Sequence, residues 1–480
     1  MAELLSKEKL IEMEEKMVSI GTRFTGCKAH EDWIDYISEQ MTNLGYEVKE
    51  DVKTFKRWEP KDWALSFETA EGEKVDVDKE DVSYYPYSGI TDEEGVSGEL
   101  KYCGSKGINT FYTGTKGKIA VIAMPLFQAG CGLCFKKRKG GIYPDTFTPP
   151  QKQSSPVVAT FVIAPLITMA RRAGAKAVIC VMTGCSDEMA RHQYLPFIKK
   201  YAGIPALWVG ETTGKKIIAA AKAHKSASVK LTGTVEDNAT TRTVYAVLPG
   251  MDFNRSILVN THTDGVNAFE ENAPIGLISL AKYFAEKPIE ERKHTLVFSF
   301  VTGHFQLCQF GNAMNQVTTL FLNAHPEFWD GKEGHMLATA GVTLEHLGCT
   351  QWADNEDHTH FVKVSDVDPE LVYASNDYMK DIYIEAVQGR KYTKTLVLRP
   401  KNFVHFGEGQ PIYKKGIPDL SLCPGPDYLC NDADDGYIDK INYDMMEEQI
   451  ETFRKVIERL DNESRKSIGK NDFYSLGFRF

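Results

Sequence analysis

An apolar run that ends in a cluster of polar residues constrains the fold of this chain more than any other feature. Residues 256–260 have the composition of a buried strand, and a Thr-His-Thr-Asp-Gly stretch that contains His262 and Asp264 follows directly. Such strands occur in parallel sheets covered on both faces. In open α/β folds, ligands bind at the carboxyl ends of the strands. The pattern therefore predicts an α/β fold with a functional site at this strand end.

The rest of the second half alternates between strand and helix patterns. Strands are predicted at 256–260, 295–301 and 341–346, and helices at 274–286, 373–387 and 443–460, with one more helix after Gln306. Two further helices are predicted near the start of the chain, at 6–20 and 29–44. This order predicts a mixed, mostly parallel sheet flanked by helices.

The segment 52–241 has a different pattern of predicted secondary structure, with shorter strands, more turns and fewer helices. A chain of 480 residues is expected to form more than one domain. We therefore predict one domain from 1–51 and 242–480, with 52–241 as an inserted β-rich domain. Within the insert, residues 126–156 are rich in Gly, Lys and Pro, and we expect a long loop there that reaches over the site as a lid.

Composition limits the class of partner and the compartment. The formal net charge is -10, which argues against binding to nucleic acid or to an anionic membrane. Neither a long apolar span nor a signal peptide is recognisable, and the ten cysteines are those of a reduced, cytoplasmic protein. The lone Cys131/Cys134 pair is interpreted as two thiols in a loop. The expected partner is a small molecule or a short peptide.

The residues after the first strand have the chemistry of metal ligands. His262 ends the strand, and Asp264 is placed to orient its ring from the second coordination sphere. Glu270 and Glu271 are adjacent, so we expect only one of them to face the site. A second candidate pair, Glu345 and His346, ends another predicted strand, and again only one is expected to face inward. Mixed nitrogen and oxygen ligands suit zinc and similar cations.

Several segments, in this order and spacing, resemble the M28 family of zinc aminopeptidases with an inserted protease-associated (PA) domain. The entry segment is similar at 21–26 and 34–48, and the closing section at 416–418 and 428–441. The segments 117–122 and 173–181 resemble a PA domain. The resemblance implies a phosphorylase/hydrolase-like zinc-peptidase fold.

The resemblance also assigns roles to single residues. The family's two-metal site has an H-x-D motif, which His262 and Asp264 match. Its bridging Asp matches Glu271, and its next ligand matches Glu345. An Asp of its Ser-Asp-His segment matches Glu408.

Three positions depart from the family pattern. The general base is replaced by His304, the next ligand by Phe305, and the last histidine ligand by Cys430. Phenylalanine cannot coordinate a cation, so the second metal half-site is expected to be degraded. His304 is able to act as base, acid or ligand.

We therefore predict a metal-dependent hydrolase with one divalent ion, Zn by preference with Fe or Mn open, that acts on an amide, peptide or related carbonyl group. The predicted metal ligands are His262, Glu271 and Glu345, with His304, His346 and Cys430 as weaker candidates, and the predicted catalytic residues are His304, Asp264 and Glu408. Two alternatives stay open, a lyase, hydratase or isomerase on the same scaffold and a non-catalytic pseudo-peptidase. The aromatic C-terminal tail leaves a homo-oligomer open.

Overall fold

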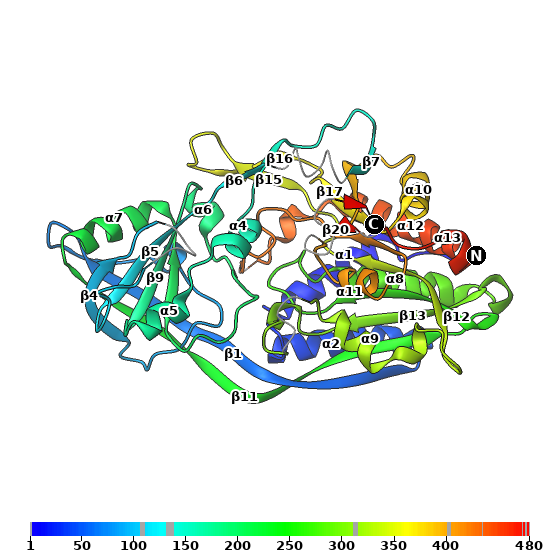
Figure 1. The fold of residues 1–480 in the computed structure, drawn as a ribbon, viewed down its shortest axis with the longest axis horizontal. Helices are drawn as coiled ribbons and strands as arrows, with labels where there is room; N and C mark the ends of the chain where they lie inside the picture. Colours follow the sequence, from blue (N-terminus) through cyan, green and yellow to red (C-terminus); the bar gives the residue numbers. More distant parts are fainter. Residues whose placement is uncertain are drawn as a thin grey trace.

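The computed structural model shows two lobes joined by a long two-stranded ribbon (Figure 1). It describes residues 2–105, 111–130, 139–310, 315–400, 405–433 and 435–472, together with the backbone of 474–475 and 478–479. Cys131 and Cys134 lie outside the described residues.

The larger lobe is built on a mixed sheet in the order β11-β13-β12-β14-β19-β17-β18-β7. Four neighbouring pairs in it are parallel: β13 with β12, β12 with β14, β14 with β19, and β17 with β18. This confirms the predicted mostly parallel α/β sheet. The strands are β12 (Asp252–His262), β13 (His294–Val301), β14 (Leu337–Leu344), β17 (Glu370–Ala374), β18 (Thr395–Leu398) and β19 (Asp419–Leu422).

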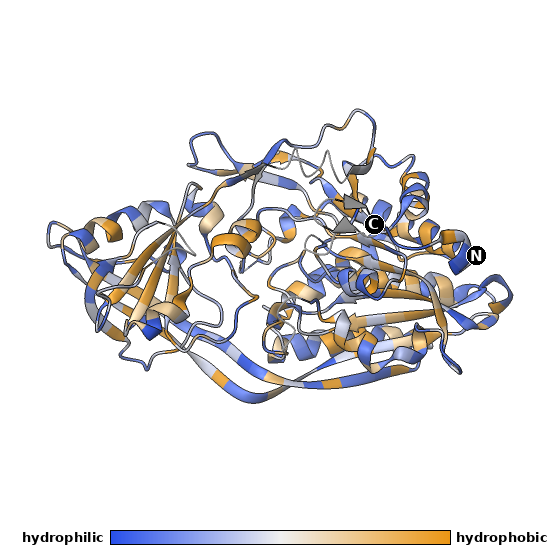
Figure 2. Cartoon of the chain, in the orientation of Figure 1, coloured by the Kyte–Doolittle hydropathy of each residue, from blue (hydrophilic) through white to orange (hydrophobic). Residues whose placement is uncertain are grey.

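Helices cover both faces of this sheet because alternate side chains of its central strands are apolar in both directions. Ile257 and Val259 pack in the main hydrophobic core, whereas Leu258 packs in a second cluster with Phe321 and Ile412. Figure 2 shows the hydrophobic strands in the interior of this lobe. The first face is covered by α1 (Lys7–Ser19), α2 (Lys28–Asn43), α8 (Ala273–Glu286) and α12 (Tyr443–Asp461), and the second by α9 (Thr318–Ala324) and α11 (Gln410–Lys414).

The ribbon between the lobes consists of β1 (Val48–Glu68) and β11 (Ser226–Leu248), which pair antiparallel along most of their length. The predicted domain boundaries, at 51/52 and 241/242, fall inside these two strands. The assignment of 52–241 as an inserted PA-like domain stays a prediction.

The smaller lobe contains a sheet in the order β3-β10-β9-β5-β4. The pairs β4 with β5, β5 with β9 and β9 with β10 are parallel. Residues 164–166, which include Pro165, separate two helices of this lobe. The elements are β3 (Val82–Tyr84), β4 (Val96–Tyr102), β5 (Ile119–Pro125), α4 (Pro156–Ile163), α5 (Ile167–Arg172), β9 (Ala177–Thr183), β10 (Ala206–Val209) and α7 (Glu211–Lys222).

The segment predicted as a loop at 126–156 contains three short strands among its described residues. β6 (Gln128–Gly130) pairs with β8 (Lys152–Ser154). β7 (Lys139–Tyr143) adds to the edge of the larger sheet beside β18. This segment is therefore attached to the larger lobe by strand pairing. Within the described chain, no helix combines the length and the apolar character that a membrane crossing requires.

Candidate metal centre

The candidate site lies at the carboxyl ends of three neighbouring parallel strands, as the sequence predicts. His262 is the last residue of β12, His304 follows β13, and Glu345 follows β14 directly. Glu270 and Glu271 lie between β12 and α8. Parallel pairing of β13, β12 and β14 brings these strand ends to one edge of the sheet.

Two overlapping groups of side chains could each hold a metal ion, and they share His262. One consists of His262, Glu345 and His346, and the other of His262, Glu270 and His304. In each group the potential ligand atoms all lie within 4.8 Å of one another. All five residues are buried. The structure therefore brings His262, Glu345, His346 and His304 together as candidates, and adds Glu270.

Hydrogen bonds to backbone carbonyls orient two of the imidazoles. Nδ1 of His262 lies 3.0 Å from the carbonyl oxygen of Asp264, and Nδ1 of His346 lies 2.6 Å from that of Pro424. Because a carbonyl oxygen only accepts, Nδ1 carries the hydrogen in each ring, and Nε2 is left with a free lone pair. This is the tautomer that a metal ligand requires.

Four buried acceptor atoms at the site have no hydrogen-bond donor. They are Nε2 of His262, Nε2 of His346, Oε2 of Glu270 and Oε2 of Glu345. Buried polar atoms are rarely left unpartnered, because desolvation without compensation costs a few kcal/mol each. A divalent cation bound by either group would satisfy the lone pairs within that group, and imidazoles with a carboxylate are a donor set that zinc accepts. The residues therefore fit the metal that the sequence predicts.

Burial also shifts the pKa values of the candidate ligands. Burial raises the pKa of Glu345 to about 7 and that of Glu270 well above its usual range. Burial lowers the pKa of His346 to about 3, and burial together with the nearby histidines lowers that of His262. Low solvation disfavours the charged form of each group. A divalent ion would offset the effect of burial on the carboxylates by favouring their ionised form, and it would bind the neutral form of the imidazoles.

His304 differs from the other two histidines because a carboxylate holds it. Its Nδ1 lies 2.6 Å from Oε1 of Glu408, and its ring stacks on His262 with centroids 4.1 Å apart. Burial lowers its pKa, but the hydrogen bond and charge of Glu408, with the charges of Glu270 and Glu345, raise it to about 9. His304 is therefore placed as a proton donor beside the candidate ligands.

Glu408 lies where the sequence predicted a site residue, in a loop that touches both His304 and Glu345. Its carboxylate also accepts a hydrogen bond of 2.8 Å from the backbone N–H of Thr318, and its own N–H donates to Glu345. Gly407 allows the backbone of this loop to lie close to the Glu345 carboxylate. It has φ of +78°, and a Cβ there would clash with the Glu345 carboxylate.

Asp264 positions the turn that carries His304. Its carboxylate accepts hydrogen bonds from the backbone N–H groups of Gly303, His304 and Phe305 at 3.0–3.2 Å, and from the Thr25 hydroxyl at 2.5 Å. His262 instead contacts the backbone carbonyl of Asp264. The Asp264 side chain therefore holds the neighbouring loop, and does not orient the His262 ring as the sequence suggested.

We expect Asp264→Asn to destabilise the protein by about 2 kcal/mol, because an amide lacks the negative charge and replaces one of the two acceptor oxygens with an NH2 donor that faces a backbone N–H group. Thr25→Val, which removes only the hydroxyl donor, should cost about 1 kcal/mol. Denaturant unfolding of the two variants measures the difference. Equal losses would show that the three backbone hydrogen bonds contribute nothing beyond the hydroxyl contact.

Glu271, which the sequence analysis placed among the metal ligands, belongs to neither group of candidate ligands. Its carboxylate forms a buried ion pair with Arg23, from the turn between α1 and α2. The adjacent Glu270 carries the carboxylate that lies beside His304 and His346, with oxygen–nitrogen distances of 3.7 and 3.3 Å. Arg23 lies in the segment 21–26, between the two helices predicted near the start of the chain.

Solved structures share this architecture over almost the whole chain. The aminopeptidase of Aneurinibacillus sp. strain AM-1 has 15% sequence identity and a TM-score of 0.58, over 94% of this chain and 93% of its own. The Bacillus subtilis zinc aminopeptidase BSAP has 15% identity and a TM-score of 0.60, over 94% of each chain. The Shewanella amazonensis M28 peptidase precursor has 14% identity and a TM-score of 0.61, over 95% and 96%. No family model matches the sequence, and no curated protein is similar to it.

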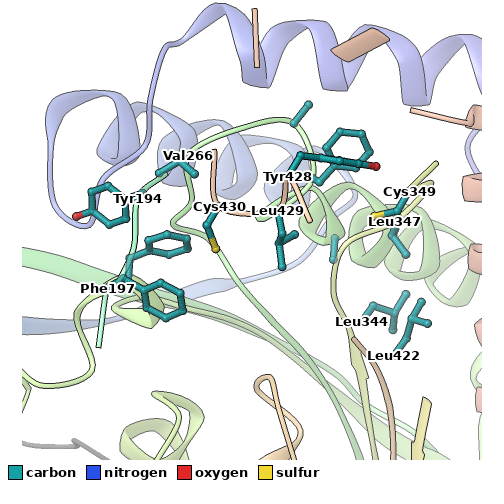
Figure 3. Close-up of a cluster of buried hydrophobic side chains, with 14 of the residues drawn as sticks. Tyr194, Phe197, Val266, Leu344, Leu347, Cys349, Leu422, Tyr428, Leu429 and Cys430 are labelled. Atoms are coloured by element: carbon teal, nitrogen blue, oxygen red, sulfur yellow. The ribbon is translucent and has the colours of Figure 1, made fainter. Parts of the chain in front are cut away.

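The chain has the M28 aminopeptidase fold. Two positions that the resemblance to M28 enzymes assigns to metal ligands are occupied here by buried groups in apolar surroundings. Phe305 stacks on Phe197 with centroids 4.6 Å apart. Cys430 lies between Phe197 and Leu429 in a hydrophobic cluster, as Figure 3 shows. Neither residue is part of a group of candidate ligands within the described chain.

A pocket of about 140 Å³ opens onto the candidate ligands. Glu270, His304, Glu345 and His346 form its polar side. The apolar part of the lining includes residues of α4 and Phe197, which belong to the smaller lobe. These wall residues are distant in the chain from the candidate ligands and carry no reactive group, so the sequence pattern does not indicate them.

Proposed function

We propose that this protein is a hydrolase that uses one divalent metal ion, preferably zinc, to cleave an amide or related carbonyl group. The observation that carries the proposal is the set of four buried, unpartnered lone pairs on His262, Glu270, Glu345 and His346 at the strand ends of an M28-like fold. When bound, a divalent ion lowers the pKa of a water molecule and polarises a carbonyl group.

The chain's own residues would bind the substrate and move the proton. His304 has its Nδ1 engaged by Glu408, so Nε2 is the atom that can exchange a proton with a substrate in the pocket. Glu408 fixes the orientation of the ring and stabilises its charge. The apolar walls exclude water from the reacting group, which strengthens each electrostatic contact.

One ion is proposed because the positions expected to hold a second metal ion, at Phe305 and Cys430, lack side chains that would coordinate it. Phe305 has no lone pair, and burial raises the pKa of the Cys430 thiol well above its usual range, so the thiolate that binds metals is disfavoured.

Elemental analysis of purified protein tests the proposal. We expect one zinc per chain after dialysis, and below about half an equivalent in His262→Asn, because the ligand's lone pair is lost. His294→Asn is the matched control, since His294 is a buried histidine at the opposite end of β13. Two equivalents would contradict the single-ion proposal. Metal-free protein would contradict the hydrolase and favour a non-catalytic pseudo-peptidase.

A non-hydrolytic reaction is the second candidate, because His304 and Glu408 form an acid–base pair where M28-like sequences are expected to have a carboxylate base. Such a pair suits proton transfer in a lyase, hydratase or isomerase. Turnover in heavy-oxygen water separates the two. Hydrolysis places the label in the product carboxylate, whereas elimination or isomerisation does not.

A further inference from the structure

We infer that the pocket beside the candidate ligands binds an uncharged apolar acyl group, and that it excludes the free α-ammonium group that aminopeptidase substrates carry. This inference rests on the proposed function and specifies its substrate class. It follows from the residues that line the pocket and from the roles of the charged groups among them.

The walls of the pocket define the size and polarity of the group that fits. Apolar side chains from both lobes form them, among them Val157, Val158, Phe161, Phe197, Leu371 and Leu429. The volume of about 140 Å³ is close to that of cavities that hold benzene. A branched aliphatic or phenyl-sized group is therefore the expected occupant.

The mouth of the pocket continues this apolar surface. Phe161 and Phe406 both line it, and their ring centroids lie 6.3 Å apart. They remain 38% and 37% exposed, which is unusual for phenylalanine. An acyl group that packs against these rings would cover both of them and lose its own contact with water.

The described lining offers no counter-charge to an ammonium group. Among the described lining residues, the only carboxylates are Glu270 and Glu345, and both belong to the candidate metal ligands. The nearby Glu408 is engaged by His304 and by the N–H of Thr318. A substrate ammonium would therefore be buried without a partner, which is strongly unfavourable.

A pair of hydroxamates tests the inference, because they chelate zinc and differ in one group only. L-Leucine hydroxamate carries the α-ammonium group, and 4-methylpentanohydroxamate has the same side chain without it. We measure their binding by calorimetry to protein whose zinc content has been determined beforehand. We expect 4-methylpentanohydroxamate to bind at least about tenfold more tightly, because an unpaired charge costs more than about 1.4 kcal/mol.

Other outcomes separate this inference from the proposed function. Equal binding, tighter binding of leucine hydroxamate, or binding of neither to zinc-loaded protein would overturn the inference and leave the metal site intact. Protein that holds no zinc would refute the proposed function, and the inference with it.

A variant that supplies the missing counter-charge provides an independent check. Val157→Asp places a carboxylate in the pocket wall near the start of α4, where a helix tolerates an acidic residue. We expect it to improve the relative affinity for leucine hydroxamate about tenfold or more. Val162→Asp is the control on the same helix, because Val162 is half exposed and does not line the pocket. An unchanged preference in folded Val157→Asp would contradict the inference.

Discussion

Glu270→Gln is expected to weaken zinc binding by more than about 100-fold, whereas Glu271→Gln is expected to leave it unchanged. Even outer-sphere partners of a metal ligand contribute about 10- to 100-fold to affinity, so loss of a charged ligand should exceed that range. The Glu270 carboxylate lies beside His304 and His346, while that of Glu271 is held by Arg23. Competition against a chelating dye measures both affinities.

These neighbouring substitutions are matched in chemistry and burial, so each controls for the other. Circular dichroism establishes that both variants are folded before zinc is added. Loss of zinc in Glu271→Gln with retention in Glu270→Gln would restore the assignment that the sequence favoured. The double variant Arg23→Met/Glu271→Gln, which removes the whole ion pair, should also retain zinc.

Arg23→Met is expected to destabilise the protein by about 3–5 kcal/mol, because it leaves the Glu271 carboxylate buried without its partner. Arg23 is 2% exposed and also donates hydrogen bonds to the backbone carbonyls of Met17 and Asn267, at 3.0 and 2.8 Å. It therefore links the N-terminal helices to the loop that carries Glu270. Chemical denaturation followed by far-ultraviolet circular dichroism measures the loss.

The double variant Arg23→Met/Glu271→Gln should recover part of this stability, since it removes the uncompensated charge. A double variant that is no more stable than Arg23→Met would show that the loss comes from packing and backbone contacts, not from the carboxylate. A surface ion pair such as Lys28 with Asp32 provides the contrast, because its removal should cost less than about 1 kcal/mol.

Much of the fold could be predicted because its central strands and covering helices have clear periodicity. The helix predicted at 443–460 is observed as Tyr443–Asp461, and the strand predicted at 295–301 as His294–Val301. The missed strands of the larger sheet include β7, β17, β18 and β19, which have only four or five residues each. Runs of that length carry too little pattern to distinguish strand from loop.

The candidate site could be predicted only to the level of which strand ends contribute. His262, Glu345 and Glu408 lie where the spacing placed them. The family position favoured Glu271 over Glu270, whereas the candidate ligand groups contain Glu270; the two residues lie in turns before α8, where strand alternation does not apply. His346 was ranked below Glu345 because of the family position as well. It has φ of +55°, so the chain leaves the strand there and both side chains reach the candidate ligand group.

Some residues that would recognise the substrate lie in a different part of the sequence from the residues that would carry out the reaction. Part of the apolar wall comes from residues 155–161 and 197, whereas the candidate ligands come from residues 262–346. Substitutions in the first set would alter which acyl group fits without touching the coordinating atoms. Such a modular arrangement allows new substrate preferences to evolve, or to be engineered, while a fixed reactive centre is retained.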